Sequence, residues 1–225
     1  MINYIIMKIA VCIYGQPRSY NIGHDHMRAF MNRHPSFSFD FFLHAWVSTQ
    51  KMSHSPWRPI DESQLSYPDV DALQNELVKL YKPLQCAFEQ PIPHDIVGSY
   101  TNTKVYNESP EKIKNNAYNI ISQFRSRNRV RNLFENYVLT TREEYDMVLM
   151  IRYDNLFHAN VRLLNIDKTK VYIAFENGRK IFKDNHILCP PDVFLNWFDF
   201  DANFPKIANN TDIKEKMAQY REPKN

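Results

Sequence analysis

The chain has 225 residues, which suits one domain or one domain with a small appendage. Hydrophobic residues make up 44% of it and charged residues 24%, as in an ordinary soluble globular protein. The formal net charge of +3 is too small to argue for a nucleic-acid-binding protein.

Three cysteines, Cys12, Cys86 and Cys189, are widely spaced and form no CxxC pair. Two of them lie in apolar runs, so we expect buried, reduced thiols in a reducing compartment, and hence a cytoplasmic protein. The apolar start, residues 1–14, is too short to span a membrane and is interrupted by Lys8. It lacks a basic segment and a small-residue cleavage site, so neither a signal peptide nor a transmembrane segment is expected.

The first predicted strand is Lys8–Tyr14, a short apolar run rich in β-formers that breaks at Gly15. A glycine after a strand lets the backbone turn sharply and approach a ligand closely. Pro17 stiffens the loop, and Arg18 offers a planar fork of donors suited to phosphate. The alternative is a simple strand-to-helix turn with a surface arginine.

A helix is predicted over Asn21–His34. The triplet His24–His26, which reads His-Asp-His, resembles a metal-ligand cluster. Adjacent residues on a helix point in different directions, so we expect these three at the surface. The expected packing stripe of the helix has four members: Ile22, Met27, Phe30 and Met31.

The second predicted strand is Phe39–Trp46, with His44 and Trp46 on one face near its carboxyl end. They could line the same cleft as the Gly15 loop, or they could belong to an aromatic core strand. Polar loops are expected over residues 47–68 and 91–109. Between them lie a helix and a third strand: Asp69–Tyr81, with Asp69 as a possible N-cap, and Leu84–Glu89.

The longest predicted helix begins after an N-cap at Ser109 and runs to about Thr140. Arginines interrupt the apolar stripe of this helix. Burying their charge costs free energy unless each guanidinium contacts an anion. Arg127 or Arg131 could therefore face the cleft and bind phosphate; the alternative is a solvated basic face on a bent helix. Arg125 and Arg129 point elsewhere. The segment 126–131, SRNRVR, also resembles a nucleic-acid-binding patch, but the surrounding acidic residues weaken that interpretation.

The most informative stretch is Tyr145–Phe157, YDMVLMIRYDNLF. Its apolar run, bounded by polar residues, predicts a strand buried on both faces of a parallel sheet. Arg152, Asp154 and Asn155 then lie at the carboxyl end of that strand, where ligands bind in open α/β sheets. Together they could hold a metal ion and a phosphate; the alternative is a buried strand that ends in an ordinary Arg–Asp pair.

A strand at Lys170–Phe175 and an extended segment at Phe182–Cys189 follow. Asp184 and His186 are two residues apart, so both face the same side of an extended segment. With Asp154 they could complete an oxygen-rich metal site with one imidazole. Two further helices are predicted: Val193–Phe198 and Ile213–Tyr220.

The alternation of strands and helices predicts an α/β domain with a mixed, mostly parallel central sheet flanked by helices. The sequence has no Walker P-loop, GxGxxG, GxSxG or HExxH motif. Their absence counts against P-loop kinases, Rossmann dehydrogenases, serine hydrolases of the elbow type and zincins.

Taken together, the chain resembles a family of small GT-A-type glycosyltransferases of bacteria, phages and large DNA viruses such as the chlorella viruses. Four landmarks carry the resemblance in the expected order: KIAVCIYGQPRSY, FDFFLHAW, YDMVLMIRYDNLF and DNHILCPPDVFLNW. The resemblance implies one GT-A-like, Rossmann-like domain over residues 1–225. Residues 7–160 would bind the nucleotide sugar, and residues 161–225 would form the acceptor side. A viral source would place the protein in the host cytoplasm.

The family binds a nucleotide-sugar donor, usually a UDP-sugar, with a divalent metal, typically Mn²⁺ or else Mg²⁺, and glycosylates a glycan or protein-linked acceptor. By resemblance, Asp154 corresponds to the metal-binding carboxylate of the family's DxD motif, and Asp184 lies near the transferred sugar or the metal. The first acid of that motif is Arg152 here, so either Arg152 neutralises the diphosphate or the metal binds weakly. The loop that would cradle the nucleotide consists of Tyr14, Gly15, Gln16, Pro17 and Arg18.

A metal with an arginine would neutralise the leaving diphosphate. An inverting enzyme would also need a base, for which Asp184 is the candidate, whereas a retaining enzyme would not need one there. Two other classes of function remain open. One is a nucleotide-sugar or glycan-binding module without catalysis, and the other is a nucleic-acid-binding protein that uses Arg125–Arg131.

Overall fold

The structure is a computed structural model, and it describes residues 7–52, 66–92, 110–157, 163, 165–175 and 182–199. Within these ranges, the side chains of residues 110–117, 174–175 and 182–185 are not described. Most of both predicted loops, the N-cap at Ser109 and the predicted helix Ile213–Tyr220 lie outside the described residues.

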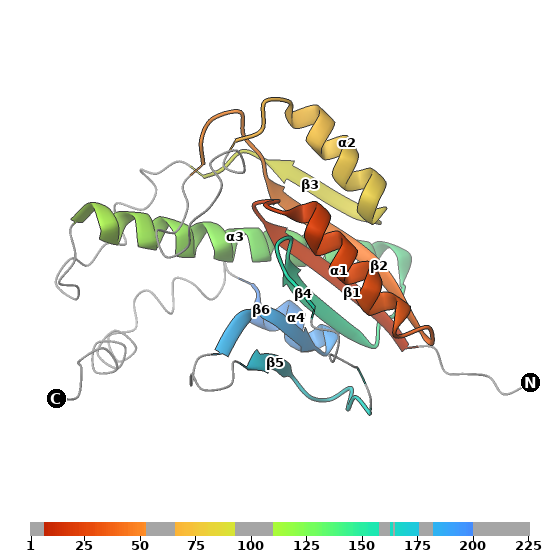
Figure 1. Cartoon of the computed structure of the whole chain (residues 1–225). Coiled ribbons are helices and arrows are strands. Elements are labelled where there is room, and N and C mark those ends of the chain that lie inside the picture. Colours follow the sequence, from red (N-terminus) through yellow and green to blue (C-terminus); the bar gives the residue numbers. More distant parts are fainter. Residues whose placement is uncertain are drawn as a thin grey trace, which may run out of the picture.

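A six-stranded sheet with the order β3-β2-β1-β4-β6-β5 forms the centre of the molecule (Figure 1). The first four strands in this order are parallel, whereas β6 runs antiparallel to β4 and β5 runs antiparallel to β6. The predicted mixed, mostly parallel sheet is therefore confirmed. The strands are β1 (Met7–Gly15), β2 (Phe37–Trp46), β3 (Gln85–Glu89), β4 (Met147–Arg152), β5 (Tyr172–Phe175) and β6 (Phe182–Cys189).

Helices cover both faces of the sheet because the central strands are apolar on both sides. On one face, α1 (Tyr20–Asn32) and α2 (Val70–Tyr81) pack on alternate strand residues such as Val11. On the other face, α3 (Pro110–Thr141) and α4 (Pro191–Trp197) pack on the residues between them, such as Cys12. None of the helices within the described residues is long and apolar enough to cross a membrane.

Helix α1 shows where the sequence-based stripe was wrong. Met27 and Phe30 are buried as predicted, but Ile22 is 51% exposed. His24, expected at the surface, is buried with its ring edge-on to Tyr81 at 5.0 Å between centroids. The reason is that α1 packs with its His24 side toward α2, so the apolar stripe is rotated away from Ile22.

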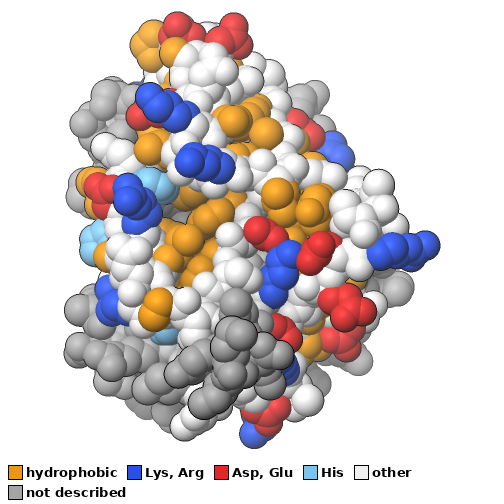
Figure 2. All heavy atoms as spheres, turned by 90° about the vertical axis from the view of Figure 1, so that its right-hand side faces the viewer, with side chains coloured by type: hydrophobic (Ala, Val, Ile, Leu, Met, Phe, Trp, Pro, Cys, Tyr) orange, Lys and Arg blue, Asp and Glu red, His pale blue; other side chains and the backbone are white. Residues whose placement is uncertain are grey.

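The side of the molecule seen in Figure 2 carries a hollow in which apolar side chains gather, with lysine and arginine side chains beside it. A pocket between α1, β2 and α2 is lined by apolar residues that include Phe39 and Leu80 and by three cations, Arg28, Lys79 and Lys82. It forms where β2 extends past β3, because β3 pairs only with the second half of β2.

Candidate functional site

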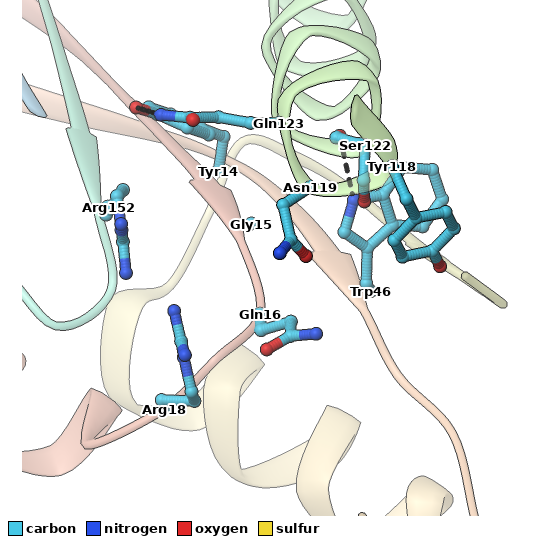
Figure 3. A pocket seen from close by; sticks show the side chains of 10 residues that line it. All are labelled: Tyr14, Gly15, Gln16, Arg18, Trp46, Tyr118, Asn119, Ser122, Gln123 and Arg152. Atoms are coloured by element: carbon cyan, nitrogen blue, oxygen red, sulfur yellow. Dashed lines mark hydrogen bonds between the residues drawn. The ribbon is translucent and has the colours of Figure 1, made fainter. Parts of the chain in front are cut away.

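A second pocket lies at the carboxyl edge of β1, β2 and β4, between these strand ends and α3 (Figure 3). Its cavity volume is about 140 Å³. The loop after β1, the end of β2, the end of β4 and one stretch of α3 all contribute side chains. The lining residues are Tyr14, Gly15, Gln16, Arg18, Trp46, Tyr118, Asn119, Ser122, Gln123 and Arg152.

The turn at Gly15 is held by a buried hydrogen-bond chain. Gly15 has φ +104°, a conformation that favours glycine, and its N–H donates to Ser126 Oγ at 2.8 Å. Ser126 Oγ also lies 2.6 Å from His44 Nδ1, and the hydroxyl can donate its proton there while it accepts from Gly15. Burial, with a smaller contribution from Arg129, lowers the pKa of His44 to about 3, so its 3.8 Å contact with Glu89 is not an ion pair at neutral pH.

Arg127 lies beneath the pocket and supports its wall. It is 4% exposed, and its Nη2 donates to Tyr14 Oη at 2.8 Å. The guanidinium carbon also lies 4.9 Å from the centroid of the Tyr14 ring and 5.4 Å from that of Phe124. Arg127 thus positions Tyr14 and is not one of the residues that line the pocket.

Two arginines converge on one carboxylate at the mouth of the pocket. Arg152 Nε donates to Asp154 Oδ1 at 2.9 Å, and Arg152 Nη2 donates to Asp154 Oδ2 at 2.6 Å. Arg18 Nη2 lies 4.0 Å from the same Oδ2. Figure 3 shows the side chains of Arg18 and Arg152 directed toward one another. Both arginines line the pocket, so an anion there would meet two guanidinium groups.

Two of the three side chains predicted to bind a divalent metal, Asp154 and His186, have other contacts in the structure. Both oxygens of Asp154 accept hydrogen bonds from Arg152, and the His186 ring packs edge-on against Phe157 at 5.2 Å. Asp184 lies near the start of β6, at the carboxyl edge of the sheet, but its side chain is not described. Among the described residues no three His, Cys, Asp or Glu side chains form a group that could hold a metal ion.

Arg131, predicted to meet phosphate, has another position. Its Nε donates to the backbone carbonyl of Leu195 at 2.9 Å, and its Nη1 pairs with Glu135 at 2.6 Å. These contacts tie α3 to α4, because Leu195 belongs to α4. Pro17 is buried in the loop after β1 and does not line the pocket, whereas its neighbour Gln16 does.

The contribution of α3 to the pocket was not predicted from the sequence. Asn119 points into the pocket beside Gln16 (Figure 3), and its buried Nδ2 has no hydrogen-bond partner among the described residues. Gln123 Nε2 donates to Tyr14 Oη at 3.3 Å. A signal was present, because polar residues recur at helical spacing upstream of Arg127: Asn119, Ser122, Gln123 and Ser126.

Trp46 and His44 occupy different layers of the site. Trp46 lines the pocket as predicted and donates from Nε1 to the backbone carbonyl of Ser122 at 3.2 Å. His44, on the same face of β2, is fully buried and contacts Ser126. Of the two alternatives that the sequence left open, the cleft position holds for Trp46 and the core position holds for His44.

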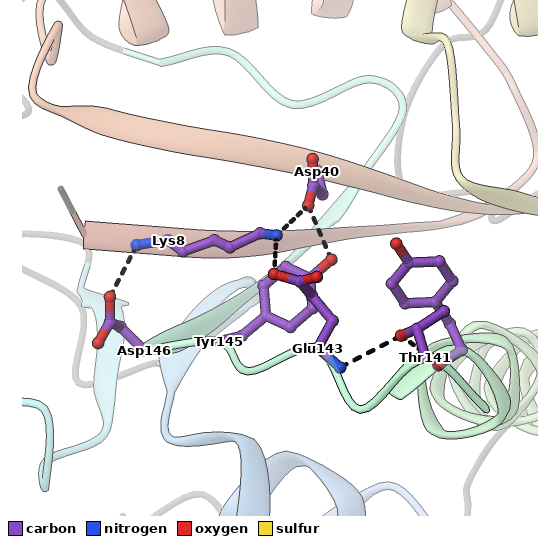
Figure 4. A network of polar contacts seen from close by, with 7 residues as sticks. Lys8, Asp40, Thr141, Glu143, Tyr145 and Asp146 are labelled. Carbon is purple, nitrogen blue, oxygen red and sulfur yellow. Dashed lines mark hydrogen bonds and ion pairs between the residues drawn. The ribbon is translucent and has the colours of Figure 1, made fainter. Parts of the chain in front are cut away.

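Another cluster of charged residues lies at the opposite, amino edge of the sheet (Figure 4). Lys8 Nζ lies 2.6 Å from Glu143 Oε1 and 3.1 Å from Asp40 Oδ2, and Tyr145 Oη donates to Asp40 at 2.8 Å. The Lys8 backbone N–H donates to Asp146 at 2.7 Å. Each of the three acids has a lysine, tyrosine or backbone N–H partner, and the cluster joins β1, β2 and the segment before β4, so it is a structural connection.

Comparisons of the chain with protein-family models, with curated proteins and with solved structures found no match.

Proposed function

We propose that the chain is a glycosyltransferase that binds a nucleotide-diphosphate sugar, such as a UDP-sugar, in the pocket at the carboxyl edge of β1, β2 and β4. The observation that supports this proposal is the convergence of Arg18 and Arg152 in a pocket at the ligand-binding edge of an α/β sheet. The opposite wall, with Trp46, Tyr118 and Asn119, offers aromatic surface and amide groups suited to a nucleobase.

The proposed reaction uses this arrangement to stabilise a leaving group. The bond between the anomeric carbon and the diphosphate oxygen breaks, and the electron pair leaves with the diphosphate. An acceptor hydroxyl of a glycan or a glycosylated protein forms the new bond to that carbon and gives its proton to a base. Guanidinium groups at the diphosphate stabilise the charge as it develops. Asp184, whose backbone lies at the same edge, is the candidate base for an inverting reaction.

Turnover of UDP- and GDP-sugars with a panel of glycan acceptors tests the proposal, with both nucleotide release and sugar transfer measured. Arg152→Gln is expected to lower turnover by about 100-fold, since it removes a donor aimed at the developing charge. The matched control is Arg28→Gln, which alters an exposed arginine of α1. Equal turnover in Arg152→Gln and the wild type would refute the site assignment.

A second candidate is a binding module for nucleotide sugars without catalysis. It is favoured by the pairing of Asp154 with Arg152, because the acid of the DxD-like motif is then occupied by a neighbour. If nucleotide sugars bind saturably but no acceptor supports turnover, the chain is a binding module and not a transferase.

The nucleic-acid interpretation of Arg125–Arg131 has little support. Arg127 is buried against Tyr14, Arg129 pairs with Glu89 at 3.2 Å, and Arg131 pairs with Glu135. Salt-dependent binding of RNA or DNA needs cations that can reach phosphates. Only weak binding to either is expected at physiological salt.

A further inference from the structure

We infer that the pocket binds the diphosphate group through Arg18 and Arg152 without a divalent metal, and that Asp154 is a positioning residue for Arg152. The inference deepens the proposed function and rests on it for the identity of the ligand. Its core, a metal-independent site for pyrophosphate groups, rests on the contacts among these three side chains.

The first step of the argument concerns the hydrogen-bonding capacity of Arg152. A guanidinium carries five N–H donors, and Asp154 accepts two of them. Because the two bonds are parallel and bidentate, they fix the plane of the guanidinium at the end of β4. Three N–H donors remain on a group whose orientation is already set, and the side chain lines the pocket.

The second step concerns charge. Arg18 and Arg152 contribute two positive charges to the mouth of the pocket, and Asp154 returns one negative charge. The side chains of these three residues are only 16%, 23% and 24% exposed, so solvent screens them incompletely. These three side chains together therefore carry one excess positive charge. It would offset the negative charge of a diphosphate, as a divalent cation does in metal-dependent enzymes.

The third step concerns Asp154 itself. A metal ligand must offer its oxygen lone pairs to the ion, and each Asp154 oxygen already accepts a short charged hydrogen bond. Two of the roughly four lone-pair sites of the carboxylate are thus taken, and the positive charge of Arg152 opposes the approach of a cation to the others. The two roles predict opposite results for Asp154→Asn: loss of binding for a metal ligand, and retained binding for a positioning residue that can still accept one N–H.

Calorimetric titration with inorganic pyrophosphate and with UDP, each in EDTA and in Mn²⁺, tests the inference. We expect dissociation constants in the two conditions that agree within about threefold. Arg152→Gln and Arg18→Gln should each weaken pyrophosphate binding by at least about tenfold, the effect of losing roughly one charged hydrogen bond. Arg152→Lys should restore only part of it, because an ammonium lacks the planar fork.

Asp154→Asn should keep pyrophosphate affinity in EDTA within about threefold of the wild type, since a neutral amide also raises the net positive charge of the site. If Arg152→Gln alone does not fold, the double variant Arg152→Gln/Asp154→Asn should fold, because it removes both charges of the pair together. The double variant should also bind pyrophosphate weakly. Arg28→Gln is the control and should leave binding unchanged.

Binding that requires Mn²⁺ and is lost in Asp154→Asn would overturn the inference, as would pyrophosphate binding in EDTA that neither arginine variant weakens. The outcome is separable from that of the proposed function. If pyrophosphate binds in EDTA through both arginines but no nucleotide sugar binds or turns over, the metal-independent anion site stands and the glycosyltransferase proposal fails.

Discussion

Ser126 connects the two strand ends that form one side of the pocket. Its hydroxyl accepts from the Gly15 N–H and contacts His44 Nδ1, so one side chain of α3 joins the turn after β1 to the buried face of β2. Water does not reach the contact between Ser126 and His44, because both residues are 0% exposed. A buried polar group that loses its partner keeps the full cost of desolvation.

Ser126→Ala is therefore expected to lower the free energy of unfolding by about 1–3 kcal/mol, measured by urea denaturation. It should also weaken pyrophosphate binding, since the Gly15 turn lies in the pocket. The control is Thr140→Ala on the same helix, whose exposed hydroxyl bonds only the carbonyl of Asn136. A stability change in Ser126→Ala no larger than that in Thr140→Ala would contradict the role assigned to Ser126.

The neutral state of His44 predicts a pH dependence of stability. Its pKa is about 3 in the folded protein, lowered chiefly by burial, against 6.5 for an unperturbed histidine. The unfolded chain therefore binds a proton that the folded protein does not, and the free energy of unfolding falls as the pH drops below 6.5. For this one group the slope approaches about 1.4 kcal/mol per pH unit.

Urea unfolding between pH 6.5 and about pH 5, a range above most carboxylate titrations, measures this slope. His44→Gln should unfold with a shallower dependence on pH than the wild type. His26→Gln, which changes a half-buried histidine of α1 and leaves His44 in place, should keep the wild-type slope. Equal slopes in His44→Gln and the wild type would show that His44 is not held neutral.

Residue types could be selected from the sequence, but their partners could not. The arginines that interrupt the α3 stripe, Arg127 and Arg131, stood out because buried charge is costly. Their partners are decided by packing between distant segments: Arg127 meets Tyr14 of β1, and Arg131 meets the carbonyl of Leu195. Helical spacing cannot show which of two arginines faces a pocket and which faces another helix.

At the scale of elements, Gly23 determines how closely α1 approaches the end of β4. A Cβ atom at this position would lie 1.8 Å from the backbone oxygen of Tyr153 and 3.0 Å from its carbonyl carbon. Tyr153 lies between Arg152 and Asp154, so the glycine sets the distance between α1 and the arginine–carboxylate pair. No flexible side chain is available to move aside, because the contact is with backbone.

Gly23→Ala should therefore destabilise the protein by about 1–3 kcal/mol or more, although alanine normally stabilises a helix relative to glycine. Displacement of the Tyr153 backbone should also weaken pyrophosphate binding. The control is Ala29→Gly at an exposed site of α1, which should cost about 1 kcal/mol and leave binding unchanged. A net gain of stability in Gly23→Ala would contradict this packing.

Most elements were predictable because their signals are local. The cap of α2 is an example: Asp69 accepts from the Ala72 N–H at 2.8 Å, as its position before an apolar stripe indicated. Apolar runs in the sequence predicted the buried strands. For example, β4 ends at Arg152, one residue after the run Met147–Ile151. Strand direction carries no such local signal, so the antiparallel placement of β6 came only from the structure.

At the scale of the whole molecule, two apolar layers share one continuous sheet. Phe30 of α1 is central to one layer and Phe134 of α3 to the other, and each is 1% exposed. Strands β1 and β4 contribute side chains to both layers. If one layer loses its packing, the strands that support the other layer are therefore disturbed. The described domain should thus unfold in one cooperative transition.

Phe30→Ala and Phe134→Ala should each lower the free energy of unfolding by about 3–5 kcal/mol and shift the same single transition. Circular dichroism and tryptophan fluorescence, followed in parallel during urea denaturation, should give coincident curves. Leu139→Ala, at a position 58% exposed on α3, should cost less than about 0.5 kcal/mol. Two separated transitions in either phenylalanine variant would mean that the layers unfold independently.

The length of α3 connects the pocket to the far side of the core. One continuous helix runs from Pro110 to Thr141 and packs across β1, β2 and β3. Gln123 in the pocket wall and Phe134 in the core are separated by about 16 Å along its axis. Both sites belong to one continuous helix. Substitutions around Phe134 that change the tilt of α3 would therefore also move Asn119 and Gln123 in the pocket wall. Under the proposed function, we expect substitutions around Phe134 to alter ligand preference although every pocket residue is unchanged.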